Sequence, residues 1–288
     1  MTRPQANVDE ATVEGFGAEW AAFDQSRISD AQYQRYFDSY FGSFPFESLP
    51  DGAEGFDLGC GSGRWAAGVA GRVGKLHCID ASGQALDVAR RRLAGLPNVA
   101  FHLATVDAMP LAEDSQDFGY SLGVLHHVPN IQAALADCVA KLKPGAPFLL
   151  YLYYALDNRP AWFRALWKAS NQGRKVISRL PFRLRRAVTD AIAIGVYWPL
   201  ARAARLAERA GAKSEHLPLS FYRRSSLYTM RTDALDRFGT RLEQRFSRQQ
   251  VEAMMAEAGL VDIHFAEGPP YWVAWGRKSA TSRGEPDC

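Results

Sequence analysis

Three glycines, Gly59, Gly61 and Gly63, lie in the run DLGCGSG that starts at Asp57, between an apolar segment and a segment with helical spacing. Glycine lets a backbone come close to a ligand, and the N–H groups that open a helix can point at that ligand. The GxGxG spacing puts Arg64 where a dinucleotide-binding fingerprint has its third glycine. The run therefore predicts a ligand-binding turn, with a turn that only needs flexible backbone as the alternative.

Two carboxylates follow the next apolar segments of the chain. Asp80 ends the second of these segments, 21 residues after Gly59, and can accept hydrogen bonds from the 2′- and 3′-hydroxyls of a ribose. Asp107 follows the third and can accept from an exocyclic amine such as adenine N6. Helix capping by Asp80 and turn capping by Asp107 before a proline are the alternatives.

The pair His126-His127 lies where the fourth apolar segment meets a helix. A histidine there can take a proton from an acceptor hydroxyl or amine, because its pKa is near neutrality. Packing is the alternative for both, and His126 is the preferred candidate for a base. No His, Cys, Asp or Glu group has metal-ligand spacing and the four cysteines form no CxxC pair, so we expect no metal site.

The elements that must position these residues alternate between short strands and helices. We expect strands at 54–59, 75–80, 98–104, 117–124 and 147–154, and a final antiparallel pair at 261–267 and 271–278. Such alternation predicts an α/β fold with a doubly wound, mostly parallel sheet. Around it we expect an N-terminal helical cap (1–50), an α/β domain (51–154 and 247–278), a helical lid inserted at 155–246 and a flexible tail (279–288).

Five segments, FDLGCGSGRWA, LHCIDAS, VDAMPL, DFGYSLGVLHHV and LKPGAPFLLY, resemble in order and spacing the class I S-adenosylmethionine-dependent methyltransferases, in the broad group with an LHHV segment. The resemblance covers roughly residues 54–154 and 247–278. It implies a Rossmann-like sheet of seven strands in the order 3-2-1-4-5-7-6, with the seventh antiparallel. It is nearly silent on the substrate.

The resemblance also implies where S-adenosylmethionine binds. Its methionine end lies at Gly59–Gly63, its ribose at Asp80, and its adenine near Ala81, Asp107 and Ala108. Ser121, Leu122 and Gly123 form the floor beneath the reactive methyl. FGAEWAAFD (16–24) resembles a segment that folds over the cofactor in related proteins, so Trp20 is expected to contact it, with aromatic packing as the alternative.

The implied function is methyl transfer to a small-molecule acceptor by in-line displacement, with the methylated atom (O, N or C) left open. Besides His126, the candidates at the acceptor are Tyr154, at the exit of the fifth strand, and Tyr222, in a loop returning to the cleft. Nucleic acid is not expected, because SLGV stands where nucleobase-amine methyltransferases carry Asn/Asp-Pro-Pro-Tyr/Phe. A lipid-like acceptor, a non-catalytic cofactor-binding regulator and a nicotinamide enzyme are the alternatives.

Basic charge is concentrated in the insertion. Residues 155–246 hold 19 Lys+Arg and 7 Asp+Glu, a net charge of +12. This charge suits a solvated face, an anionic acceptor held by Arg223 and Arg224, or an anionic membrane surface met by residues 179–186 beside the apolar stretch 191–200. The favoured partner is a small anionic or aromatic acceptor, a membrane is not favoured, and the oligomeric state is open. The polar N-terminus lacks a signal-peptide pattern, so we expect a cytoplasmic protein.

Overall fold

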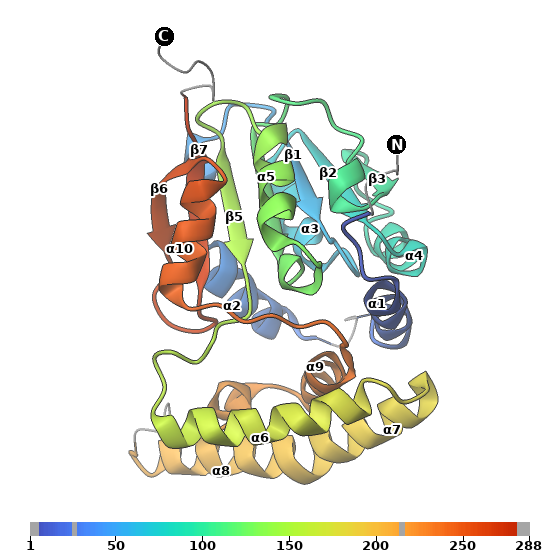
Figure 1. Ribbon diagram of the computed structural model, residues 1–288, viewed down its shortest axis with the longest axis vertical. Helices are drawn as coiled ribbons and strands as arrows, with labels where there is room; N and C mark the ends of the chain where they lie inside the picture. The colour runs from blue at the N-terminus through green and yellow to red at the C-terminus, as the bar shows by residue number, and fades with distance from the viewer. Residues whose placement is uncertain (1–5, 25–27, 213–216, 281–288) are drawn as a thin grey trace.

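The computed structural model describes residues 6–24, 28–212 and 217–280. In this part of the chain one sheet has the strand order β3-β2-β1-β4-β5-β7-β6 (Figure 1). Its strands are β1 (Glu54–Leu58), β2 (Lys75–Asp80), β3 (Val99–Leu103), β4 (Phe118–Leu122), β5 (Pro147–Tyr151), β6 (Leu260–Phe265) and β7 (Val273–Lys278). β7 pairs antiparallel with both β5 and β6, and the other pairs are parallel. The predicted fold class and strand order are confirmed.

Helices cover both faces of the sheet, as a doubly wound fold requires. On the face toward the viewer in Figure 1, α5 (Ile131–Lys141) and α10 (Arg248–Glu257) pack on a core that includes Phe56, Ile79 and Phe148. On the other face lie α3 (Arg64–Val69) and α4 (Gly83–Arg92), over a second core. Burial on both faces explains why the central strands read as nearly continuous apolar runs.

Two helices precede the sheet, within the segment expected to form an N-terminal helical cap. α1 (Glu10–Ala22) is capped by Asp9, whose side chain accepts from the N–H of Thr12, and α2 (Asp30–Phe41) is capped by Ser29. The aromatic face of α2 packs into the second core, where Phe37 stacks on Phe41 with ring centroids 4.5 Å apart. α1 instead lies beside α4 and α9, which places it at the open end of the sheet (Figure 1).

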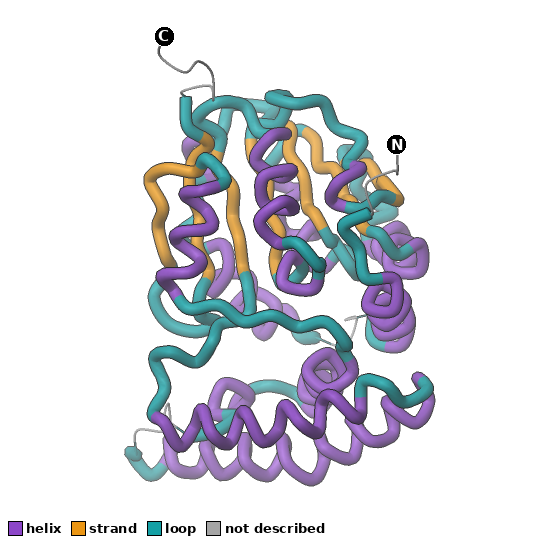
Figure 2. The backbone as a smooth tube through the Cα atoms, viewed as in Figure 1, coloured by secondary structure: helices purple, strands orange, loops and turns teal. Residues whose placement is uncertain are grey.

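The insertion forms a separate helical layer beyond the carboxyl ends of the strands. It contains α6 (Ala161–Ile177), α7 (Phe182–Ile192), α8 (Trp198–Arg209) and α9 (Leu227–Gly239), of which α9 lies nearest the sheet (Figure 1). Two chain connections join this layer to the sheet and pair with each other where Ala155 N–H donates to Phe246 O at 2.8 Å (Figure 2). None of the described helices combines the length and apolar character needed to cross a membrane.

Two features of this layer differ from what the local sequence suggests. A proline such as Pro199 usually marks the start of a new helix, but here a π-helical turn, Ala193–Tyr197, joins α7 and α8 into one rod. The wider π-helical turn accommodates the ring of Pro199, which in an α-helix would clash with the carbonyl four residues earlier. The helical spacing of Trp162, Phe163 and Trp167 suggests one core-facing side, but Trp162 is 55% exposed and the neighbouring Leu166 is 53% exposed.

Candidate active site

A cleft of about 830 Å³, partly open to solvent, lies at the carboxyl ends of β1, β2 and β4 beneath α1. The strand ends contribute Gly59, Asp80, Ala81, Leu122 and Gly123, and His127 lies in the turn after β4. The N-terminal segment closes the other side with Val8, Thr12, Val13, Phe16 and Trp20. The structure therefore brings predicted cofactor residues at the strand ends together with Trp20 of the N-terminal segment.

The glycine turn between β1 and α3 has a backbone that only glycine adopts easily. Gly59, Gly61 and Gly63 have φ values of +74°, +53° and +71°. A Cβ on Gly59 would overlap the Val124 side chain, and one on Gly61 would lie 2.9 Å from Trp20 Nε1. Gly59 lines the cleft, while Trp20 lies against Gly61. Neighbouring side chains lie so close to this turn that a Cβ would not fit, so the glycines are needed for space as well as for backbone flexibility.

Asp80 holds the turn in place and also faces the cleft. Its Oδ2 accepts from the N–H of Gly61 at 2.9 Å, and its Oδ1 accepts from the N–H of Ser82 at 2.8 Å. Burial raises the pKa of this carboxyl, and the two backbone hydrogen bonds oppose that shift. Each carboxylate oxygen has a second lone pair, so two acceptor positions remain for ligand hydroxyls.

Asp57 lies beneath the turn and does not line the cleft. Its exposed fraction is 1%, and Oδ2 has no hydrogen-bond partner among the described residues. Burial raises its pKa to about 8; the nearby Tyr120 hydroxyl opposes this shift and the charge of Asp80 adds to it. The carboxyl group of Asp57 is therefore mostly a neutral acid near pH 7. Because Asp57 does not line the cleft, it is not positioned to contact a cofactor there.

Three other predicted cofactor residues also lie outside the cleft. Ser121 is fully buried, and its Oγ donates to Leu58 O at 3.1 Å, which ties β4 to β1. Asp107 and Ala108 are exposed, and Asp107 Oδ2 accepts from the N–H of Asn7 at 3.3 Å. Their neighbours Thr105 and Val106 line the cleft instead, because the 3-10 turn Val106–Ala108 carries the next two side chains outward.

Of the two histidines, the structure places His127 at the cleft rather than the preferred His126. His126 is fully buried against Tyr153, with ring centroids 3.9 Å apart, and burial lowers its pKa well below the usual value. His127 Nδ1 lies 2.6 Å from Leu242 O. A carbonyl only accepts, so Nδ1 carries the proton and Nε2 keeps a free lone pair. Burial lowers the pKa of His127 while Asp236 opposes the shift, so the ring is neutral near pH 7.

Neither predicted catalytic tyrosine lines the cleft. β5 ends at Tyr151, so Tyr154 turns away and lies beside Tyr271, with ring centroids 5.4 Å apart. Tyr222 lies in the 3-10 helix Ser220–Arg224, not in a loop, and packs against Tyr197 inside the helical layer. Tyr153 is the tyrosine that reaches back toward the histidines, and its hydroxyl donates to Asp236 Oδ2.

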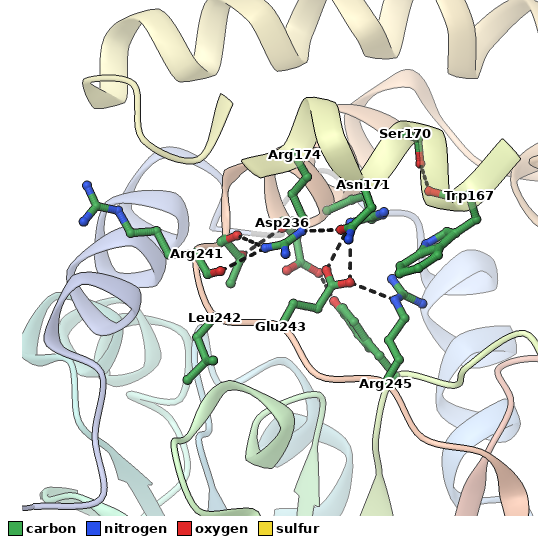
Figure 3. A network of polar contacts seen from close by, with 12 residues as sticks. Trp167, Ser170, Asn171, Arg174, Asp236, Arg241, Leu242, Glu243 and Arg245 are labelled. Atoms are coloured by element: carbon green, nitrogen blue, oxygen red, sulfur yellow. Dashed lines mark hydrogen bonds and ion pairs between the residues drawn. The ribbon is translucent and has the colours of Figure 1, made fainter. Parts of the chain in front are cut away.

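A buried polar network fixes the segment that carries Leu242 (Figure 3). Glu243 pairs with Arg245 at 2.8 Å and with Arg237 at 3.3 Å. Burial alone would raise the pKa of Glu243, but these two arginines hold it below the usual value. Arg174 Nη1 donates to Thr240 O at 2.7 Å and to Arg241 O at 2.9 Å. The network thereby holds the carbonyl that sets the tautomer of His127.

Local sequence patterns do not predict this network, which links α6 and α9 to the strand ends. Arg237, Glu243 and Arg245 read in sequence as ordinary charged residues near a helix end, and Asp236 as one more polar position. The only available signal was the close succession of opposite charges in DRFGTRLEQR, which is also common in solvated loops. Their burial depends on the packing of the insertion against the sheet.

Residues 56–145 match the family described as Methyltransferase domain. An uncharacterised 37.1 kDa protein of a Streptomyces fradiae transposon is 34% identical over 102 residues, 34% of this chain and 30% of that protein. The ubiquinone biosynthesis O-methyltransferase of Azoarcus sp. is 35% identical over 97 residues, 33% of this chain and 41% of that protein. The chain thus spans less than half the length of these two relatives.

Among solved structures, the YcgJ protein of Bacillus subtilis has 15% sequence identity and a TM-score of 0.49, over 82% of this chain and 70% of that one. The family match and the strand order together identify the α/β unit as a methyltransferase domain. It is of class I, the S-adenosylmethionine-dependent type. The match ends at residue 145, before the helical layer begins.

Proposed function

We propose that the protein transfers a methyl group from S-adenosylmethionine to a small-molecule acceptor. One observation carries this proposal: the Asp80 carboxylate, beside the glycine turn, and the ring of His127 line a single cleft of the methyltransferase domain. A candidate ribose-binding acid and a candidate proton acceptor therefore border the same cleft.

The residues of the cleft fit S-adenosylmethionine. The two open acceptor positions of Asp80 suit the ribose hydroxyls, and Ala81, Thr105 and Val106 offer a mainly apolar surface for adenine. Leu122 and Gly123 form the floor toward the acceptor side. When bound, the cofactor supplies a methyl group already activated on a sulfonium. The protein then has to hold the acceptor in line with that methyl, which can supply most of the rate enhancement.

His127 is the group that can take a proton from a hydroxyl or amine acceptor. Its Nε2 is unprotonated near pH 7, and the Leu242 carbonyl keeps the ring in that tautomer. Asp236 lies close enough to stabilise the positive charge that protonation creates. An acceptor that is already nucleophilic needs only the in-line position, so the base matters most for a weakly acidic hydroxyl.

The choice of acceptor belongs to the parts of the chain outside the family match, the N-terminal segment and the helical layer. Relatives named for ubiquinone biosynthesis and for demethylmenaquinone methylation support a quinone-type aromatic acceptor as the first class to test. Arg223 and Arg224 do not favour an anionic acceptor, because both already pair with Glu208 at 3.1 Å.

Two measurements test the proposal. Calorimetry should show binding of S-adenosylhomocysteine, and a panel of catechols, hydroquinones and amines should show acceptor-dependent release of that product. With a hydroxyl acceptor, His127→Gln should lower kcat by about 10²–10⁴-fold and leave cofactor affinity unchanged. His264→Gln, an exposed histidine stacked on Trp275 away from the cleft, is the matched control. Cofactor binding without turnover would favour a regulator, and no binding would reject the proposal.

A further inference from the structure

The helical layer exposes an unusual amount of apolar surface. Among the large hydrophobic side chains exposed in the described chain, all but Leu103 and Val261 lie between residues 162 and 227. We call the exposed side of α6 and of the α7–α8 rod the outer helical face. Both elements pack on α9, and the layer that they form lies at one end of the molecule, beyond the sheet (Figure 1). The packing of the layer against the rest of the chain therefore leaves this face uncovered.

On α6 the exposed apolar residues follow helical spacing. Trp162, Leu166 and Val176 are 55%, 53% and 67% exposed, and the small residues Ala169 and Gly173 continue the same stripe between them. A helix normally turns such a stripe toward the core. Here the core-facing side is a different one, formed by Phe163, Trp167, Ser170 and Arg174. On the rod, Leu184, Ile194, Trp198 and Leu206 are exposed.

The basic residues of the insertion divide into two groups. Arg174, Arg185 and Arg202 turn inward and donate to backbone carbonyls of Thr240, Gly239 and Ser225. A second group is exposed, and no ion pair involves its members within the described residues: Arg164, Lys168, Lys175, Arg179, Arg183 and Arg205. The outer helical face is therefore flanked by exposed cations that form no ion pair with the described residues.

Acidic residues are almost missing from the same stretch. Between residues 158 and 207 the sequence contains eleven Lys+Arg but a single acidic residue, Asp190. Asp190 pairs with Arg231 on α9 at 2.6 Å and is half-buried. An apolar stripe between unpaired cations, with tryptophans at both elements, suits a surface that is itself anionic and has an apolar interior.

We propose that the outer helical face docks onto an anionic membrane surface. Trp162, Leu166, Ile194 and Trp198 enter the boundary between headgroups and acyl chains, and the flanking lysines and arginines meet lipid phosphates. The rod of α7 and α8, roughly 40 Å long at 1.5 Å per residue, lies in the plane of the membrane and does not cross it. A second copy of the chain fits this face less well, because it would bring two sets of unpaired cations together.

Vesicle cosedimentation of the full chain tests this proposal without reference to methyl transfer. The protein should bind phosphatidylcholine vesicles that contain phosphatidylglycerol, bind pure phosphatidylcholine vesicles far less, and lose binding as salt screens the charges. Leu166→Glu with Ile194→Glu should weaken binding at least tenfold. The matched control is Leu103→Glu with Val261→Glu, which adds the same charge at exposed apolar positions on the sheet and should leave binding unchanged.

A second pair of substitutions distinguishes weaker membrane binding from misfolding of the variant. Lys168→Glu with Lys175→Glu changes only exposed side chains and should also weaken binding to anionic vesicles at least tenfold, with an unchanged thermal transition. Absence of binding to phosphatidylglycerol vesicles, or equal loss in the sheet control, would overturn the proposal. So would light scattering that shows a lipid-free dimer which Leu166→Glu with Ile194→Glu converts to a monomer.

Discussion

Asp80→Asn separates two tasks of one side chain, support of the glycine turn, which the structure shows, and the proposed contact with a ribose. The carboxylate accepts from the N–H groups of Gly61 and Ser82, at 2.9 and 2.8 Å, and each of its oxygens keeps one further acceptor position. Asparagine has a single acceptor oxygen and an NH₂ group in place of the other oxygen. The variant therefore keeps the size of the side chain but loses the charge and at least one acceptor position toward the ligand.

The expected loss follows from the two ribose hydrogen bonds. A hydrogen bond to a charged group contributes ~1.5–3 kcal/mol, against ~0.5–1.5 kcal/mol for a neutral pair. Loss of one bond and of the charge assistance of the other amounts to ~2–4 kcal/mol. The dissociation constant of S-adenosylhomocysteine should therefore rise by roughly 30- to 1,000-fold.

Titration calorimetry with two ligands distinguishes ribose contact from turn support. Asp80→Asn should weaken S-adenosylhomocysteine strongly and its 2′,3′-dideoxy analogue much less, because the analogue lacks the hydroxyls that Asp80 would hold. Asp87→Asn on α4, where Asp87 makes only an exposed pair with Arg90, serves as control. An equal loss for both ligands would refute the ribose assignment and leave Asp80 as a support of the turn.

Three further predictions concern the same site. Asp57 has a folded pKa of about 8, above its unfolded value of about 3.9, so its contribution to stability is complete below pH ~4 and is lost as the pH rises through 8. Urea unfolding at pH 5 and pH 7 should show the wild type losing ~2–3 kcal/mol more than Asp57→Asn, and parallel losses would contradict this pKa. Gly59→Ala should abolish cofactor binding because its Cβ overlaps Val124 at positive φ, while Gly83→Ala, with open space around it, should bind normally. Turnover, once an acceptor is found, should survive EDTA; loss restored by magnesium would reveal a metal-dependent site.

The sequence sufficed for features that depend on neighbours along the chain. The strand runs, the glycine turn and Asp80 at the end of β2 are local patterns, and the structure has them within a few residues of the expected bounds. The position of His127 depends instead on Leu242, whose carbonyl is 115 residues away in the chain. No local pattern could pair these groups, and the outward turn of Tyr154 likewise follows from where β5 stops pairing.

The basic insertion is a second case in which sequence alone is not enough. Its net charge does not predict which arginine side chains are buried and which are exposed. Helix phase supplies part of the missing information: Arg174 shares a face of α6 with Phe163 and Trp167, whereas Lys168 and Lys175 lie beside the exposed stripe. An arginine that donates to buried backbone carbonyls stabilises the fold and is not available to bind a partner. Arg185, which donates to Gly239 O at 2.9 Å, belongs to that buried group, so reversing its charge would test folding rather than membrane attraction. Only substitutions at the exposed cations measure what the outer helical face does.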